Sequence, residues 1–344
     1  MYFNNILVIG HRNIGDILFN LSVLKPLKTA FPRSNIIFLT SQNGAEFLKE
    51  NPYISEIYIY KKDFKSRFQR IQHVLGLILK LRSYKFDVIL NLKSGSLLHL
   101  FLRRNLTWRI SSRNQQTETK RNKHAIDSYL DILEENGIKF SRKDIDLRIH
   151  TGPTEKNAVD TILKVHGYDS HKKTVVFVPF ANWSGKEWSL QNYGELAKKV
   201  ARECGIQVVF VGGPDDRPKM ENIKTYQNYF IDLVGALTLR QLAALYEKAF
   251  AVVGGDTGPF HLASSVGAIP LCLFGATSHK RARPYFYPEN VVIGDKDIGC
   301  NPCYPGKNPH NCKIYHETTP CMKDITLDKV FQKFLQVTQD DTST

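Results

Sequence analysis

Short apolar runs alternate with amphipathic stretches from one end of the chain to the other. Uninterrupted apolar runs predict buried strands, and apolar positions three and four apart predict helices that pack by one face. In the first half the predicted strands are 6–10, 35–40, 56–60 and 86–90, and the predicted helices include 16–30 and 64–82. In the second half we expect strands at 174–178, 207–211, 230–233, 250–253 and 269–274, and helices at 190–203, 239–248 and 260–266. This alternation predicts an α/β protein whose parallel sheets carry helices on both faces.

The strand–helix series stops and restarts once, near the middle of the chain. Thr151-Gly152-Pro153 interrupts the pattern, and a length of 344 residues suits two domains better than one. We therefore expect two Rossmann-like, doubly wound domains, residues 1–150 and 151–344, that face each other across a cleft. Ligands of open α/β sheets bind beyond the carboxyl ends of the strands, so the loops that follow strands are the places to search for chemistry.

Composition excludes several classes of protein. Hydrophobic residues make up 42% of the chain and charged residues 23%, which is typical of a globular protein and not of a disordered, collagenous or coiled-coil one. No apolar run reaches the roughly 18 residues that a membrane-spanning helix needs. The first residues lack the basic start of a secretion signal. These features predict a cytoplasmic protein.

The net charge of +14 is distributed unevenly. Residues 1–150 hold 25 Lys and Arg against 13 Asp and Glu, whereas residues 151–344 hold 22 against 20. Such an asymmetry indicates that the first half faces an anionic partner, and a basic surface kept for solubility is the alternative. Nucleic acid is not the expected partner, because no recognition helix and no platform of interleaved aromatic and basic residues is present.

The loop after the first strand holds Gly10 and Gly15 and ends on Asp16 at the start of a helix. The glycines are five residues apart and no third one follows, so this is not the dinucleotide-binding fingerprint. Glycines at these positions allow a tight turn and a close approach of a ligand to the backbone. Asp16 is either a functional carboxylate or a helix cap, since aspartate is favoured at helix starts.

Four loops of the second half combine glycine with polar side chains. Residues 179–188 carry two tryptophans together with Asn182 and Lys186, whose charge can neutralise a phosphate; an ordinary surface loop is the alternative. Residues 254–261 place Thr257 and Gly258 where a helix begins, and free backbone N–H groups at such a start suit a phosphate. The loops at 212–216 and 275–278 follow the same logic. Together the four loops predict a nucleotide-diphosphate site.

Motifs in these loops carry a resemblance to a known family. They are Arg12-Asn13-Ile14-Gly15-Asp16 followed by 24–32, residues 124–130, Lys186-Glu187-Trp188, Gly212-Gly213-Pro214, residues 256–263 and residues 273–277. In this order, and over nearly the whole chain, they resemble glycosyltransferase family 9, the ADP-heptose:lipopolysaccharide heptosyltransferases. The resemblance implies the GT-B fold, with the acceptor on the first domain and the nucleotide sugar on the second. It also implies an inverting, metal-independent transfer of heptose from ADP-heptose to a lipopolysaccharide core or a related surface glycan.

The resemblance assigns roles to individual residues. Asp16 would be the general base that takes a proton from the acceptor hydroxyl. Lys186 and the backbone at Thr257 and Gly258 would stabilise the leaving diphosphate, and Asp256 would hold hydroxyls of the donor sugar. The expected donor-binding residues are Asn182, Lys186, Gly213, Asp215, Asp256, Thr257, Gly258, His261 and Thr277, although His261 is equally consistent with a core histidine. The expected acceptor-binding residues are Arg12, Asn13, Arg103, Arg104, Lys120, Arg121 and Lys123.

The chain departs from the family pattern at a few positions. Ser22 stands where the family usually has proline, and His279 with Arg283-Pro284 replaces the usual sequence after Thr277-Ser278. The second departure lies near the donor, so another nucleotide sugar remains an alternative. A sugar-nucleotide epimerase or a non-catalytic binding protein of the same fold are further alternatives, but the presence of Asp16, Lys186 and Asp256 favours an enzyme.

Four of the six cysteines cluster near the carboxyl end, at Cys300, Cys303, Cys312 and Cys321. In a cytoplasmic chain this spacing favours a structural zinc or iron site, and reduced thiols or disulfides are the alternatives. Residues 302–320 are rich in proline and polar residues and cannot form their own core, so a tetrathiolate would hold them in place. Such a metal would have no part in catalysis.

A lipopolysaccharide-directed enzyme would work at the inner face of the cytoplasmic membrane. The basic residues of the first half, including Arg67, Arg70, Lys80 and Arg82 in the predicted helix at 64–82, would favour peripheral attachment to an anionic lipid surface. This helix is expected to pack on the sheet as an ordinary amphipathic helix rather than to insert into the membrane.

Overall fold

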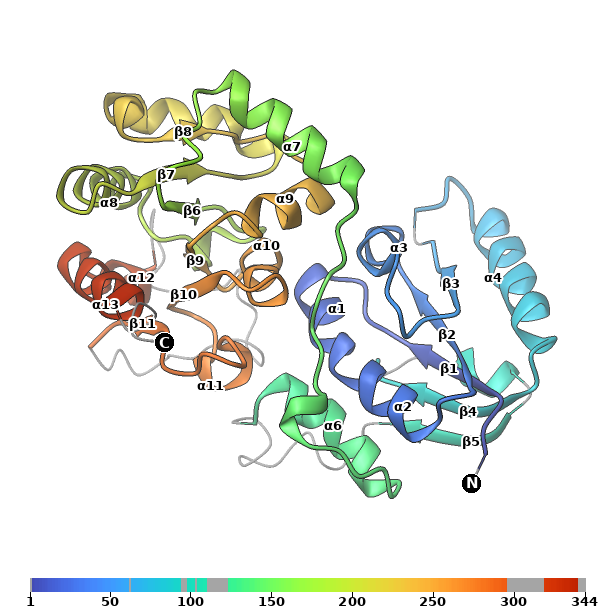
Figure 1. Cartoon of the computed structure of the whole chain (residues 1–344). Coiled ribbons are helices and arrows are strands. Elements are labelled where there is room, and N and C mark those ends of the chain that lie inside the picture. The colour runs from blue at the N-terminus through green and yellow to red at the C-terminus, as the bar shows by residue number, and fades with distance from the viewer. Residues whose placement is uncertain are drawn as a thin grey trace. The chain divides into compact units, whose positions relative to one another are not determined.

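The computed structural model describes residues 2–61, 63–93, 98–102, 104–109, 123–295 and 319–339. The chain forms two compact units, residues 1–150 and 151–344 (Figure 1). Within the described ranges no helix has both the length and the apolar character needed to cross a membrane. Cys300, Cys303, Cys312, Arg103, Lys120 and Arg121 lie outside these ranges.

The first unit is built on a five-stranded parallel sheet. Its strands are β1 (Asn5–Ile9), β2 (Asn35–Thr40), β3 (Glu56–Ile59), β4 (Phe86–Asn91) and β5 (Arg104–Arg109), in the order β3-β2-β1-β4-β5. The helices are α1 (Ile14–Asn20), α2 (Leu24–Ala30), α3 (Gln42–Leu48), α4 (Arg67–Arg82) and α6 (Ala125–Glu135), with short 3-10 turns at Leu21–Val23, Leu98–Phe101 and Arg142–Asp144. In Figure 1, α1 and α2 lie on one side of the sheet and α4 on the other.

The helix predicted at 16–30 is interrupted in the structure. It forms α1, a 3-10 turn at Leu21–Val23, and then α2. The reason is Pro26, which has no N–H to donate to the carbonyl of Ser22, so a continuous α-helix cannot pass through this turn. The hydroxyl of Ser22 instead donates to the carbonyl oxygen of Phe19 at 2.7 Å. The sequence pattern found the helical segment but not its break.

The second unit contains a six-stranded parallel sheet. Its strands are β6 (Thr174–Val178), β7 (Gln207–Phe210), β8 (Ile231–Asp232), β9 (Ala251–Gly255), β10 (Ile269–Phe274) and β11 (Val291–Ile293), in the order β11-β10-β9-β6-β7-β8. The α-helices are α7 (Pro153–Val165), α8 (Leu190–Glu203), α9 (Leu239–Tyr246), α10 (Gly258–His261), α11 (His279–Ala282), α12 (Pro320–Lys323) and α13 (Leu327–Gln339). The 3-10 segments are η5 (Ser184–Lys186), η6 (Pro214–Tyr229) and η7 (Ala263–Ser265).

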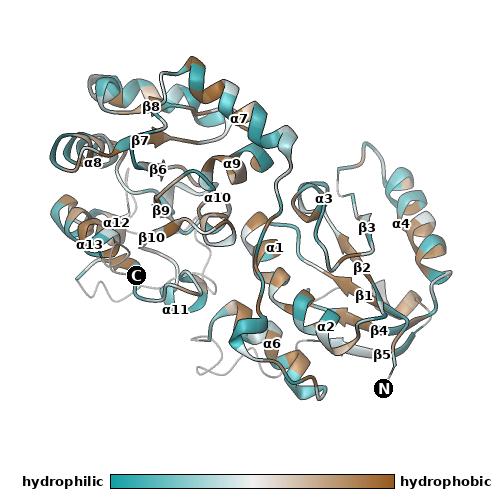
Figure 2. Cartoon of the chain, in the orientation of Figure 1, coloured by the Kyte–Doolittle hydropathy of each residue, from teal (hydrophilic) through white to brown (hydrophobic). Residues whose placement is uncertain are grey.

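The strands at the centre of the second sheet are buried throughout. Every residue of β6 and β10 is buried, and Figure 2 shows hydrophobic strands at the centre of each sheet. Strands covered on both faces read as continuous apolar runs, which is why the sequence revealed them. The edge strand β5 was not predicted, because its sequence, Arg-Asn-Leu-Thr-Trp-Arg, is not an apolar run. In the structure its Leu106 is exposed.

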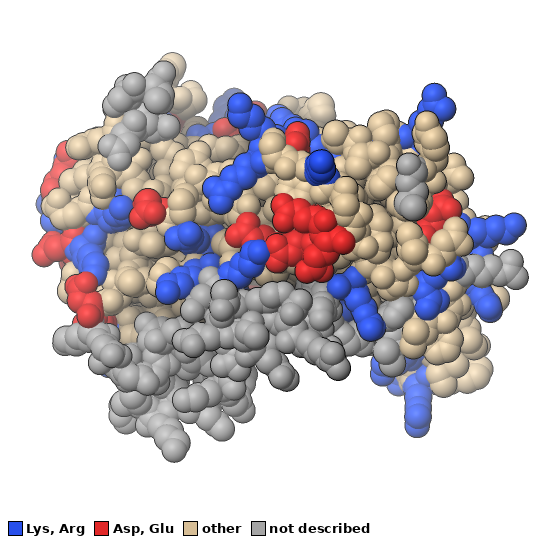
Figure 3. All heavy atoms as spheres, turned by 90° about the horizontal axis from the view of Figure 1, so that it is seen from below, with Lys and Arg blue, Asp and Glu red and all other residues tan. Residues whose placement is uncertain are grey.

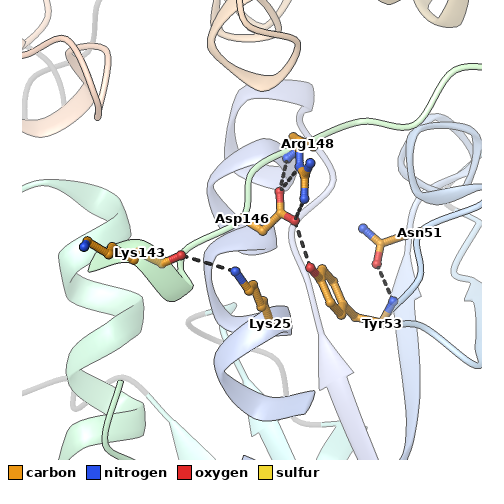
Figure 4. Close-up of polar contacts among 6 residues, drawn as sticks. All are labelled: Lys25, Asn51, Tyr53, Lys143, Asp146 and Arg148. Carbon is orange, nitrogen blue, oxygen red and sulfur yellow. Dashed lines mark hydrogen bonds and ion pairs between the residues drawn. The ribbon is translucent and has the colours of Figure 1, made fainter. Parts of the chain in front are cut away.

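The segment that leaves the first unit is fixed by a buried carboxylate (Figure 4). Asp146 accepts hydrogen bonds from Nε and Nη2 of Arg148, at 2.9 and 2.7 Å, and from the hydroxyl of Tyr53 at 2.8 Å. Lys25 donates to the carbonyl of Lys143 at 3.2 Å, a few residues earlier in the segment. Burial alone would raise the pKa of Asp146, but the bonds from Arg148 and Tyr53 outweigh it and lower the pKa to about 2.

We expect Asp146→Asn to lower the free energy of unfolding by about 2 kcal/mol at neutral pH, because a native pKa near 2 stabilises the folded state by that amount over an ordinary carboxyl. A lowered pKa stabilises the fold above the unfolded pKa, and this contribution disappears as the pH falls through the folded pKa. The difference between variant and wild type should therefore shrink between about pH 4 and pH 2. Urea unfolding at several pH values measures it. Asp160→Asn on α7 removes only an exposed ion pair with Lys248, so it should change the free energy of unfolding by less than about 1 kcal/mol.

Candidate functional site

The strand order of the second sheet places two loops next to each other. From β6 the chain proceeds outward through β7 and β8, and from β9 it proceeds the other way through β10 and β11, while β6 and β9 are neighbours. The carboxyl ends of β6 and β9 therefore form the point where the strand order reverses, which is where open α/β sheets bind ligands. The loops that begin there carry Lys186 and Asp256.

Lys186 and Asp256 form an ion pair at this point. Nζ of Lys186 lies 3.0 Å from Oδ2 of Asp256 and donates a second bond, also of 3.0 Å, to the carbonyl oxygen of the same residue. The Asp256 side chain is 11% exposed and that of Lys186 is 22% exposed. The carboxylate thus lies deeper than the ammonium group, which keeps part of its surface at the solvent.

Two further side chains bind the Asp256 carboxylate. Nε2 of His261 lies 2.7 Å from Oδ1, and Thr277, in the loop after β10, forms a side-chain hydrogen bond with Asp256. Burial by itself would raise the pKa of Asp256, but the bond to His261, the charge of Lys186 and the bond from Thr277 outweigh it. They hold the pKa of this carboxyl well below its usual range. Asp256 is therefore an anion that links the loops after β6, β9 and β10.

The Lys186 loop can lie this close to the end of β9 only because residue 255 is a glycine. A Cβ on Gly255 would lie 2.8 Å from the carbonyl oxygen of Lys186, closer than real Cβ atoms come. Behind the Lys186 loop, the indole N–H of Trp188 donates to the carbonyl of Ile325 at 2.8 Å, and the hydroxyl of Thr319 donates to the carbonyl of Gly185 at 3.0 Å. The loop after β6 is thus held from behind by the carboxyl-terminal segment.

The other predicted donor residues lie around this cluster with different degrees of exposure. Thr257 caps α10, and its hydroxyl oxygen accepts a bond of 3.4 Å from the N–H of Phe260. Gly258 is the first residue of that helix, which is a single turn. Asn182 is exposed in the loop after β6, and Gly213 and Asp215 are exposed at the start of η6.

In the loop after β7 the structured carboxylate is Asp216 rather than its neighbour Asp215. Oδ2 of Asp216 accepts a bond of 3.0 Å from the N–H of Gly213, and Lys219 bridges Asp216 and Glu187 at 3.1 and 3.2 Å. Glu187 in turn accepts from the N–H of Ala181 at 2.9 Å. This chain of bonds connects the loop after β7 to the Lys186 loop. Sequence reasoning missed Lys219, whose three-residue spacing from Asp216 was the available signal.

In the first unit, the loop after β1 is tied down through His11. Its N–H donates to Oδ1 of Asn20 at 2.9 Å, and its carbonyl accepts from the hydroxyl of Thr40 at 2.9 Å. The hydroxyl of Tyr129 in α6 lies 3.5 Å from Nδ1 of His11. Gly10 is required by space, because a Cβ there would lie 2.5 Å from the ring of Phe38. Asn20 was also missed; a polar residue within the buried stripe of α1 was the signal.

Asp16 lies in the first turn of α1, half-buried, next to the cap residue Asn13. Nδ2 of Asn13 donates to Oδ2 of Asp16 at 3.3 Å. Arg12 stacks its guanidinium over the ring of Tyr60, 4.4 Å from the ring centre. Asn13 and Asp16 are therefore in contact in the loop and helix that follow β1, whereas Arg12 contacts Tyr60.

Of the other basic residues of the predicted acceptor site, the structure describes Arg104 and Lys123, and both form local contacts. Arg104 donates to the hydroxyl of Thr107 at 2.7 Å and to the carbonyl of Leu102 at 3.1 Å, and Lys123 pairs with Asp131 at 2.5 Å. Figure 3 shows Lys and Arg side chains scattered over the described part of one face, with several groups of Asp and Glu side chains between them. The positive charge on this face is therefore interrupted.

Of the four clustered cysteines, the described residues include only Cys321. It is buried at the start of α12, and its thiol donates to the hydroxyl of Thr319 at 3.3 Å. Among the described residues no group of three or more His, Cys, Asp or Glu side chains could hold a metal ion. The metal site proposed from the sequence stays a prediction, because its other three ligands lie outside the described ranges.

The family model described as glycosyltransferase family 9 (heptosyltransferase) matches residues 74–314, which is well over half of the chain. The chain belongs to glycosyltransferase family 9. It is therefore a glycosyltransferase, and its two parallel-sheet units confirm the predicted α/β fold class of GT-B type.

Individual relatives agree with this assignment. Lipopolysaccharide heptosyltransferase 3 of Escherichia coli K12 is 27% identical over 304 residues, covering 82% of this chain and 85% of that protein. A family 9 glycosyltransferase structure from Veillonella parvula superposes with a TM-score of 0.82 at 20% identity, covering 98% of both chains. The E. coli heptosyltransferase WaaC with ADP gives a TM-score of 0.64 at 14% identity, again covering 98% of both chains. At these identities the two structures support the fold alone.

We expect Asp256→Asn to lower the free energy of unfolding by about 3 kcal/mol, because it removes one partner of a buried ion pair and leaves Lys186 without its counter-charge. Asp215→Asn is the matched control, since this exposed aspartate lies in a neighbouring loop of the same unit. Urea unfolding at neutral pH measures both variants. Equal stability of the two would contradict the role given to the Asp256 carboxylate.

Proposed function

We propose that this family 9 enzyme transfers heptose from ADP-heptose to a lipopolysaccharide core, or to a related surface glycan, with inversion at the anomeric carbon. The observation that carries the proposal is the Lys186–Asp256–His261 cluster at the reversal point of the second sheet. The names of the relatives support the substrates: the E. coli relative is a lipopolysaccharide heptosyltransferase, and the solved WaaC structure contains ADP.

The second unit is proposed to bind the nucleotide sugar. Lys186 is held in a fixed direction by Asp256 and still reaches the solvent, so a diphosphate can approach its ammonium group. As the glycosidic bond breaks, negative charge grows on the leaving diphosphate, and a preorganised cation stabilises that charge without reorganisation. Both oxygens of Asp256 have partners inside the protein, which supports a role in orienting Lys186 beside the expected one in holding sugar hydroxyls.

The first unit is proposed to bind the acceptor, with Asp16 as general base. The carboxylate takes the proton of the attacking hydroxyl while the hydroxyl oxygen forms the new bond to the anomeric carbon. The bond to the diphosphate breaks on the opposite side, and ADP leaves with the electron pair, so the configuration is inverted. Lys186 supplies the charge stabilisation at the leaving group, and in this proposal no metal ion takes part in the transfer.

The excess of Lys and Arg in residues 1–150 suits an acceptor that carries phosphates and carboxylates and is embedded in an anionic leaflet. We therefore propose that the enzyme works in the cytoplasm, attached peripherally to the inner face of the membrane. Basic residues near such a surface contribute about 1 kcal/mol each.

Calorimetric titration with ADP, UDP and GDP tests the donor. We expect ADP to bind selectively and Lys186→Gln to weaken its affinity about 10- to 100-fold, because a charge-assisted bond to phosphate contributes about 1.5–3 kcal/mol. Lys224→Gln is the control for removing a lysine charge from the same unit, because Lys224 is exposed and pairs with Glu221, three residues earlier. A preference for UDP or GDP would indicate a donor other than ADP-heptose, an alternative suggested by the departure of the His279 loop from the family pattern. Binding of none of the three nucleotides would favour a non-catalytic protein.

Asp16→Asn should reduce kcat on the order of 10²- to 10⁴-fold, because it removes the proton acceptor from the reacting hydroxyl. Affinity for ADP should stay unchanged, since Asp16 belongs to the other unit. The matched control is Asp127→Asn, an aspartate in the first turn of α6, just as Asp16 is in the first turn of α1. A full rate in the Asp16 variant, measured as ADP release with acceptor present, would exclude Asp16 as the base.

A further inference from the structure

Helix α4 exposes an apolar stripe to the solvent. Phe68, Ile71, Leu75 and Leu79 are each between 49% and 68% exposed. Their spacing of three, four and four residues places them along one face of the helix. Single exposed apolar residues are normal on a protein surface, but a continuous row of four large ones marks an interaction site.

The stripe is not the side by which α4 packs on its own sheet. Leu77 and Leu81 are buried there, in the same cluster as Leu7 of β1 and Ile37 of β2. Seen down the helix axis, at about 100° per residue, the exposed stripe points well away from these two leucines. The ordinary amphipathic helix expected from the sequence is thus present, but it carries a second apolar face that the fold leaves uncovered.

A neighbouring segment extends the apolar surface. Leu100 and Phe101, in the 3-10 turn at Leu98–Phe101, are both more than half exposed. The next residue, Leu102, is buried in the same cluster as Leu77 and Leu81 of α4. Leu102 and the two buried leucines of α4 thus share one core cluster, and the turn that precedes Leu102 adds two exposed apolar side chains to the same unit.

The charges on helix α4 itself are of one sign. Helix α4 contains Arg67, Arg70, Lys80 and Arg82, all exposed, and has no Asp or Glu. Arg82 continues the stripe three residues beyond Leu79, and Arg67 and Lys80 are the direct neighbours of Phe68 and Leu79. An occupant of this face has to accept large apolar side chains and offer negative charge next to them. An anionic lipid bilayer does both, with its acyl region and its headgroups.

We propose that the exposed face of α4, together with Leu100 and Phe101, is the surface by which the enzyme docks on anionic membranes. The inference rests on the peripheral attachment proposed above and gives it a location. The helix lies in the plane of the interface, with Phe68, Ile71, Leu75 and Leu79 below the headgroups and the arginines at the phosphates. Docking then keeps the first unit, with Asp16, at the surface that holds a lipid-anchored acceptor.

Vesicle co-sedimentation of the full chain tests the proposal, with phosphatidylcholine vesicles that either contain or lack phosphatidylglycerol. We expect binding to the anionic vesicles, and a loss of at least about tenfold in partition coefficient for the double variant Leu75→Asp and Leu79→Asp. Val165→Asp is the matched control, because Val165 is 78% exposed on α7 of the other unit. Thermal unfolding midpoints of all variants should match that of the wild type.

The charged part of the surface is tested separately. The triple variant Arg67→Gln, Lys80→Gln and Arg82→Gln should bind anionic vesicles about fivefold less tightly for each charge removed, with a weaker dependence on salt. Lys164→Gln on α7 is the control. Binding to pure phosphatidylcholine should be weak in the wild type and unchanged in the triple variant.

Three results would overturn the proposal. Anionic vesicles that bind the α4 variants as tightly as the wild type would exclude this face, and the absence of any vesicle binding by the wild type would exclude membrane attachment altogether. Concentration-dependent self-association that Leu75→Asp abolishes, without vesicle binding, would assign the face to a second copy of the chain. ADP affinity, measured on the same samples, reports on the proposed donor site independently of all three.

Discussion

A carboxylate that is largely removed from water has to be paired, because an unpaired buried charge costs several kcal/mol. Asp256 satisfies this requirement with donors from three segments, Lys186 after β6, His261 in α10 and Thr277 after β10. The three loops are therefore mechanically coupled through one anion. A shift of any of them would leave charge unpaired, so the ammonium group of Lys186 is held in one direction before any ligand arrives.

The two units hold the loops that follow their strands by different kinds of bond. In the second unit an ion pair fixes the loops at the reversal of strand order. In the first unit the loop after β1 is held by two neutral hydrogen bonds: the backbone N–H of His11 donates to Asn20, and the hydroxyl of Thr40 donates to the carbonyl oxygen of His11. Neither bond uses the Asp16 carboxylate, so the loop is positioned while Asp16 stays half-buried at the start of α1. A general base needs this combination of a fixed backbone and an accessible carboxylate.

Helix α4 illustrates how one element serves packing and surface chemistry together. Leu77 and Leu81 anchor it on the sheet, while the opposite direction carries exposed apolar and basic side chains. Apolar residues occur on two faces of this helix, so its sequence does not show a single apolar face. The pattern therefore predicted a helix but gave no indication of which apolar residues would be covered.

The sequence by itself determined the α/β class, the central strands and the loops that carry Asp16, Lys186 and Asp256. These features follow from local properties: strands buried on both faces are apolar throughout, and loops need glycine and polar residues. Only the tertiary structure decided that Lys186, His261 and Thr277 converge on one carboxylate and that Lys219 connects the loops after β6 and β7. Strand order and side-chain burial depend on contacts between residues far apart in the chain, and no local pattern encodes them.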